Sequence, residues 1–173
     1  MIVQVYLMAI RLILDSNIYG KIIEEKLEEE MKEKSIMHKH KLIIYGIRII
    51  RNELREAPKH TKDNSSLRIA LLNLYDNLIR NHELEIKPLA HNLAALYYKQ
   101  YIKNGGSVSW KFMRNDMLIV AEATISELDI VVSEDNRTMI SHPAKKAYYT
   151  TNKDHNFITP NFIGYTEFKR KLF

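Results

Sequence analysis

Acidic residues follow the two clearest apolar segments of the sequence, at the point where each segment ends. Asp15 follows the run 11–14, and Asp135 follows the run 129–133. A third acid, Asp116, stands at the predicted start of the helix that leads into the second of these segments. In parallel α/β sheets, the carboxyl ends of the strands and the starts of the helices that precede them share one edge. We therefore expect Asp15, Asp116 and Asp135 to lie in one crevice.

Glu53 is a fourth acid that can reach this crevice. It lies on the predicted helix 47–56, four residues beyond Ile49 and three beyond Ile50, which places it close to the apolar face. Four carboxylates in one crevice repel each other unless a cation neutralises them or some are protonated. Hard oxygen ligands in a chain without Cys favour Mg²⁺ or Mn²⁺. Such a site is typical of phosphodiester hydrolysis.

Each acid also has a simpler interpretation when it is taken alone. Asp15 and Asp116 are good helix N-cap residues, and capping is the favoured role for either one in isolation. Asp135 alone could initiate a turn, and Glu53 alone is typical of a charged helix surface. Independent caps, however, have no reason to converge at one end of a sheet. The joint placement therefore shifts the balance of the four acids toward a metal site.

Arginines surround these acids in the sequence. Arg48, Arg51 and Arg55 lie three and four residues apart on the helix that carries Glu53, so they form a basic stripe beside it. Two further arginines, Arg114 and Arg137, flank Asp116 and Asp135. Such residues attract phosphate groups, so they are the candidates for contacting RNA if the acids cleave it. Pairing of the same arginines with nearby glutamates is an equally weighted alternative.

The elements that must position the acids alternate along the chain. Strands are predicted at 12–14, 42–45, 84–86 and 128–132, with a late edge strand at 157–163 around Pro160. Helices are predicted at 20–34, 47–56, 67–78, 88–103 and from 115 onward. Short apolar strands that alternate with helices predict a parallel sheet between helical layers. The expected fold class is α/β, as a three-layer α/β/α sandwich with a central, mainly parallel sheet.

The composition excludes several classes of protein and of functional site. The 173 residues include 26 Lys and Arg, 21 Asp and Glu, and no Cys. The absence of Cys excludes a disulfide scaffold, a thiol nucleophile and a zinc finger, and it weakly favours a reducing compartment such as the cytoplasm. The apolar run 1–14 is too short to span a membrane. His38 and His40 are more typical of a solvated connection than of a metal site.

The length predicts one domain over residues 8–173. Residues 1–7 are then an N-terminal extension or a gene-start artefact.

Five segments resemble the motifs of PIN-domain nucleases. The similarity begins with Ile13-Leu14-Asp15-Ser16-Asn17 and ends with a closing strand and helix, and it covers roughly residues 8–173. The segments are 13–17, 51–54, 115–123, 128–136 and 160–168. Ser133 stands where the family more often has Thr, and Glu134 adds an acid beside Asp135. The Glu-rich first helix and the stretch 99–110 are longer than in compact members.

The resemblance implies a metal-dependent endoribonuclease that cleaves single-stranded RNA, very often the toxin of a VapC-type toxin–antitoxin pair. Such proteins are usually homodimers, and a small antitoxin protein covers the acidic site. By this resemblance Asn17 and Ser133 would hold the carboxylates or a metal-bound water. The catalytic acids would be Asp15, Glu53, Asp116 and Asp135, with Asp15, Asp116 and Asp135 as the metal ligands.

Three other functions remain open at the level of sequence. The first is a catalytically weak PIN-like module that binds RNA or a protein. The second is a nuclease that processes RNA on its own, without an antitoxin. The third is a phosphoacceptor domain that uses Asp15, which lacks a convincing lysine at a nearby strand end.

Overall fold

Five short strands form one sheet in which every neighbouring pair is parallel. The computed structural model describes residues 9–37, 42–59 and 66–172, and within them the strand order is β3-β2-β1-β4-β5. Residues 1–7 and the pair His38 and His40 lie outside the described residues. The strands are β1 (Ile10–Leu14), β2 (Leu42–Ile47), β3 (Glu83–Leu84), β4 (Ile130–Val132) and β5 (Asn161–Ile163).

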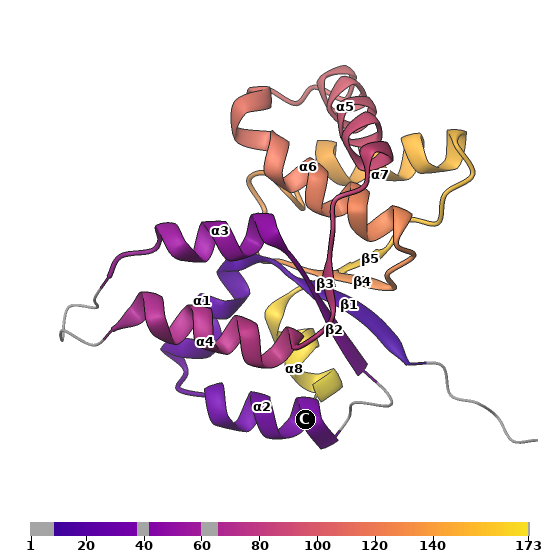
Figure 1. Cartoon of the computed structure of the whole chain (residues 1–173). Helices are drawn as coiled ribbons and strands as arrows, with labels where there is room; N and C mark the ends of the chain where they lie inside the picture. Colours follow the sequence, from indigo (N-terminus) through magenta and orange to yellow (C-terminus); the bar gives the residue numbers. More distant parts are fainter. Residues whose placement is uncertain (1–8, 38–41, 60–65, 173) are drawn as a thin grey trace, which may run out of the picture.

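Helices cover both faces of this sheet. Figure 1 shows α5, α6 and α7 packed together on one side, and α1 to α4 with α8 on the other. The three-layer α/β/α architecture that the sequence predicts is therefore present. The helices are α1 (Ser16–Glu24), α2 (Glu28–Met37), α3 (Arg48–Glu56), α4 (Leu67–Ile79), α5 (Pro88–Lys103), α6 (Trp110–Ile125), α7 (His142–Asp154) and α8 (Tyr165–Leu172). No helix in the described ranges is long and apolar enough to cross a membrane.

The central strands are apolar because both of their faces are covered. Leu12, Ile13 and Leu14 of β1 are fully buried, as are Val131 and Val132 of β4. A strand between two helical layers has no solvated face, so its sequence is a continuous apolar run without alternation. The backbone N–H of Asp15 donates to the carbonyl of Val132 over 2.9 Å, which locks the end of β1 beside the end of β4.

The predicted helix 20–34 is wrong: the segment forms two helices that start earlier and end later. Lys26 adopts a left-handed conformation with φ of 57° between α1 and α2. Its N–H donates to the carbonyl of Ile23, and the N–H of Leu27 donates to that of Ile22, which is a Schellman cap. The apolar spacing of Ile23, Leu27 and Met31 continues through the break, and Lys26 stands where glycine usually signals this cap.

Two helices of the α5–α7 layer also differ from the prediction. α6 begins at Trp110, five residues before the predicted start at Asn115, so Asp116 lies in the second turn and does not cap the helix. α7 is absent from the prediction altogether. Its buried face consists largely of small or polar residues, among them Ala144, Ala147 and Thr151, and these give a weak hydrophobic signal.

Candidate active site

Asp15 is held at the junction of β1 and α1 by hydrogen bonds from two segments. It is the N-cap of α1, and its Oδ1 accepts the backbone N–H of Ser16 over 2.7 Å. Its Oδ2 accepts Ser133 Oγ and Asn17 Nδ2, each over 2.7 Å. Burial raises the pKa of Asp15 to about 6, although the hydrogen bonds from Ser133 and Ser16 lower it. The negative charges of Glu53 and Asp135 raise this pKa further.

Asp116 reaches the same edge of the sheet from the second turn of α6. Its Oδ2 is buried and accepts no hydrogen bond from the part of the chain that the structure describes. Burial raises the pKa of Asp116 to about 7, and the hydroxyl of Thr138 lowers it. The carboxylates of Asp15, Asp135 and Glu53 raise it again. A carboxylate whose buried oxygen lacks a partner is rare in proteins and indicates a functional position.

Asp135 follows β4 and is held in a turn. Its Oδ1 accepts the backbone N–H groups of Arg137 and Thr138 over 2.9 and 3.0 Å, and its Oδ2 accepts Thr138 Oγ1 over 2.6 Å. Burial raises the pKa of Asp135, but the bonds from Thr138 and Arg137 outweigh this effect and hold the pKa below its usual value. Asp135 therefore forms the turn that its sequence position suggests, and its charge also acts on Asp15 and Asp116.

Glu134, the neighbouring acid, points toward the start of α8. Its Oε1 accepts the backbone N–H of Tyr165 over 2.7 Å, at the start of α8. Gly164 keeps this approach open, because a Cβ there would lie 2.9 Å from the same oxygen. Asp135 is thus the member of this acidic pair whose charge acts on Asp15 and Asp116.

Glu53 joins the site from α3 on the opposite helical layer. It is half-buried, and its Oε1 accepts Asn115 Nδ2 over 2.9 Å, which ties α3 to α6 across the edge of the sheet. Its charge acts on both Asp15 and Asp116. The structure therefore brings the four predicted acids into one electrostatically coupled region.

Two neighbours of the acids, Asn17 and Ser133, both donate hydrogen bonds to Asp15. Ser133 is fully buried, and its Oγ donates to Asp15 and accepts the backbone N–H of Asp135 over 3.0 Å. Asn17 Oδ1 accepts the backbone N–H of Glu134 over 3.3 Å. These bonds connect the ends of β1 and β4 through side chains.

Sequence reasoning did not identify two residues that hold the acids in place, Thr138 and Asn115. Thr138 fixes Asp135, and Asn115 fixes Glu53. A Thr three residues after Asp is a known turn pattern and could have signalled the first contact. The second contact joins residues 62 positions apart, and no local pattern announces it.

The residues fit a divalent cation in chemistry and charge. The donors are hard oxygens, the pKa values of two carboxylates are raised by burial with a contribution from their neighbours' charge, and one buried oxygen is unpartnered. In residues 9–37, 42–59 and 66–172, however, no group of three or more His, Cys, Asp or Glu side chains is gathered closely enough to hold a metal ion. Binding would therefore require Asp15, Asp116 and Asp135 to turn toward a shared point.

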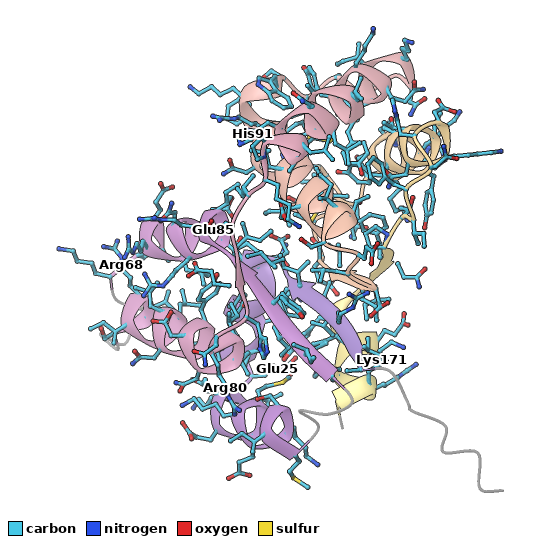
Figure 2. All side chains as sticks on the ribbon, turned by 45° about the vertical axis from the view of Figure 1, so that its right-hand side comes forward. Glu25, Arg68, Arg80, Glu85, His91 and Lys171 are labelled. Atoms are coloured by element: carbon cyan, nitrogen blue, oxygen red, sulfur yellow. The ribbon has the colours of Figure 1, made fainter. Side chains whose placement is uncertain are left out.

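A groove lined by arginines and glutamates lies between α3 and the segment 83–86. It has a volume of about 590 Å³, and Figure 2 shows Glu85 beside α3. The three predicted arginines of α3, Arg48, Arg51 and Arg55, all line it. Arg51 forms a two-pronged ion pair with Asp76 of α4, with distances of 2.9 and 2.8 Å, whereas Arg48 and Arg55 are exposed.

The remaining two arginines border the acids. Arg137 is exposed, and its charge contributes to the lowered pKa of Asp135. Arg114 is exposed at the start of the second turn of α6, two residues before Asp116. The structure thus places three of the predicted arginines along the groove beside α3 and two next to Asp116 and Asp135 in the chain.

Comparison with known proteins supports the architecture. No family model matches the sequence, and no curated protein sequence matches it significantly. Among solved structures, a chain of the VapBC2 complex from Rickettsia felis bound to a DNA fragment from its promoter is similar, with a TM-score of 0.59 and 12% identity over 90% of this chain and 98% of that one.

Two further complexes are similar. A chain of DNA-bound VapBC from Salmonella typhimurium has a TM-score of 0.56 and 15% identity, covering 90% of this chain and 98% of that one. A chain of FitAB bound to an IR36 DNA fragment has a TM-score of 0.53 and 16% identity, covering 89% and 94%. At these identities the likeness concerns the fold, and the chain has the PIN-like α/β fold that its motifs predict.

Proposed function

We propose that this protein is a Mg²⁺- or Mn²⁺-dependent endoribonuclease that cleaves single-stranded RNA. The observation that supports it most is a pair of carboxylates at the carboxyl edge of the sheet. Asp15 is buried and Asp116 has a buried oxygen, and their pKa values are raised to about 6 and about 7. No ion pair to either carboxylate is present in the described residues. A divalent cation would supply the missing positive charge.

Each residue of the site has a distinct task in this proposal. Asp15, Asp116 and Asp135 would hold the cation, and Ser133 with Asn17 keeps Asp15 aimed at it. Glu53 is oriented by Asn115 and reaches solvent, so it can accept a proton from the attacking water and release it. When bound, the cation lowers the pKa of a coordinated water and stabilises negative charge on the phosphoryl oxygens. The exposed Arg48 and Arg55 would contact flanking phosphates.

An Asp15→Asn variant tests this function. We expect it to lose Mn²⁺-dependent cleavage of a single-stranded RNA while it keeps its circular dichroism spectrum, because the amide preserves size and removes a charged ligand. Asp154→Asn is the matched control, since Asp154 is an exposed acid at the end of α7 and outside the site. Cleavage by Asp15→Asn at the wild-type rate would contradict the proposal.

We further propose that the protein acts in the cytoplasm as a homodimeric toxin that a small antitoxin protein inhibits. Support comes from the similar structures, which are VapBC and FitAB complexes bound to DNA. Expression of the chain alone should arrest growth, and co-expression of a short neighbouring gene should restore it. Cleavage in vitro without growth arrest would instead favour a nuclease that processes RNA on its own.

A catalytically weak PIN-like module for binding RNA or protein is the second candidate. The observation in its favour is that both carboxylate oxygens of Asp135 accept hydrogen bonds from Thr138 or Arg137, so a cation must compete for them. Titration calorimetry with Mn²⁺ separates the two candidates. Absence of binding at millimolar Mn²⁺ would favour the second.

A further inference from the structure

Phe112 is the most exposed Phe, Tyr or Trp side chain in the described part of the chain. It is 71% exposed, and Tyr149 follows with 50%. Tyr149 packs edge-on against Phe162 with ring centroids 6.4 Å apart, on α7 and β5. Exposure alone has little meaning, because single apolar side chains are common on protein surfaces. The position of Phe112 relative to the acids gives it significance.

Phe112 lies one helical turn before Asp116, on the side of α6 that faces the candidate site. Residues four apart on a helix are separated by about 40° around its axis and about 6 Å along it. Asn115 identifies the direction of this face, because its side chain bonds Glu53 of α3 over 2.9 Å. Figure 1 shows the start of α6 on the same side as α3, toward which β1 and β2 run. The ring therefore stands at the rim of the acidic region.

The first turn of α6 is firmly held, so the ring is displayed on a rigid support. Met113, the next residue, is fully buried. The Trp110 ring packs on Tyr98 with centroids 5.2 Å apart, and the hydroxyl of Tyr98 donates to the carbonyl of Val108 over 3.3 Å. Val108 in turn donates its N–H to the hydroxyl of Tyr101 over 3.2 Å. The long stretch between α5 and α6 thus fixes the turn that carries Phe112.

A positive charge lies beside the ring. Lys111 Nζ is 6.0 Å from the Phe112 ring centroid. An aromatic ring next to a cation is an arrangement with which proteins hold single-stranded nucleic acids, since a base stacks on the ring and a phosphate contacts the cation. An apolar protein contact would not require this charge.

We propose that Phe112 stacks on a base of single-stranded RNA next to the nucleotide that enters the acidic site, with Lys111 contacting the adjacent phosphate. This inference rests on the proposed ribonuclease function and assigns a substrate-positioning residue to it. Stacking is tolerant of base identity, so Phe112 sets the register of the strand and does not select a sequence.

Binding of a short fluorescent single-stranded RNA in EDTA tests the proposal without cleavage. Fluorescence anisotropy should show about 5- to 150-fold weaker binding by Phe112→Ala. Phe112→Trp should bind like the wild type, and Phe112→Leu should bind like the alanine variant, because leucine is apolar but cannot stack. Ile158→Ala is the matched control, since Ile158 is 84% exposed and lies near the amino end of β5.

Replacing single bases of the RNA by abasic sites completes the test. One position should weaken binding by the wild type and leave binding by Phe112→Ala unchanged. Equal affinities of the wild type, Phe112→Ala and Phe112→Leu would overturn the role of Phe112. If these proteins also differed in dimer content by ultracentrifugation, Phe112 would belong to a protein interface. Failure of the wild type to bind any RNA would contradict the proposed function itself.

Discussion

Two carboxylates on α6, one fully buried and one with a buried oxygen, show how burial can serve opposite purposes. Glu122, near the end of the helix, is fully buried, and both of its oxygens are satisfied. It accepts the backbone N–H of Lys87 over 2.8 Å and Ser126 Oγ over 2.7 Å, and Lys87 Nζ lies 3.6 Å away. Asp116, near the start, has an unpartnered buried oxygen and three acidic neighbours.

The difference lies in what the surrounding residues supply. Glu122 has donors and a cation from its own chain, so it fixes the start of α5 to α6. Asp116 is surrounded by negative charge, and the fold stabilises it poorly when it is ionised. Satisfied buried networks add rigidity, whereas unsatisfied ones destabilise the protein and persist where function requires them. We infer that Glu122 is structural and that Asp116 is functional.

The largest effect that this comparison predicts is on activity. Asp116→Asn should lower RNA cleavage by about a thousandfold, since a cation site is worth several kcal/mol of transition-state stabilisation. The same variant should be as stable as the wild type or more stable at pH 8, because it removes a repelled buried charge. Cleavage assays and urea unfolding measure the two properties. If Asp116→Asn were active, or unfolded at a lower urea concentration than the wild type, Asp116 would be a structural residue like Glu122.

Glu122→Ala should show the opposite combination. Loss of the carboxylate leaves the N–H of Lys87 and the hydroxyl of Ser126 without their acceptor, so we expect about 3 kcal/mol less stability in urea unfolding. Activity per folded molecule should remain near that of the wild type, because Glu122 lies two turns away from Asp116. If Glu122→Ala were as stable as the wild type, Glu122 would not have the structural role that we assign to it.

The pH dependence of stability offers a third test. Asp116 and Asp15 titrate near pH 7 and pH 6 when folded and near 3.8 as unperturbed groups, so the folded state binds more protons between these values. Stability without metal should therefore fall as pH rises from about 4 to 7, with a slope of up to about 1.4 kcal/mol per pH unit for each proton. Thermal unfolding across this range in EDTA checks it. Asp116→Asn should flatten the curve, and an unchanged curve would show that Asp116 is not the group involved.

The smallest expected effect concerns the support of Asp15. Ser133→Ala removes the hydroxyl that bonds Asp15 and Asp135, and such a change beside metal ligands typically lowers activity or metal affinity by about 10- to 100-fold. Ser133→Thr keeps the hydroxyl and should restore activity. If alanine and threonine behaved alike in cleavage assays, the bond to Asp15 would have no functional role.

Sequence patterns predicted the layers and the acids, because both depend on strand order and local apolar runs. The ends of β1 and β4 were clear from their apolar segments, so Asp15 and Asp135 could be placed beside each other. The start of α6 was not clear, because it depends on packing of Trp110 against Tyr98. The partner of Glu53 was equally hidden, since Asn115 meets it only through the tertiary fold. The break at Lys26 required a backbone conformation that lysine seldom adopts.

A crystal structure of the protein soaked in Mn²⁺ tests the central claim most directly. We predict an anomalous peak bounded by Asp15, Asp116 and Asp135, with the Oδ2 atom of Asp116 among the ligands. Data from Asp116→Asn crystals under the same conditions should show no peak there. An occupied wild-type lattice without any peak between these three carboxylates would contradict the account.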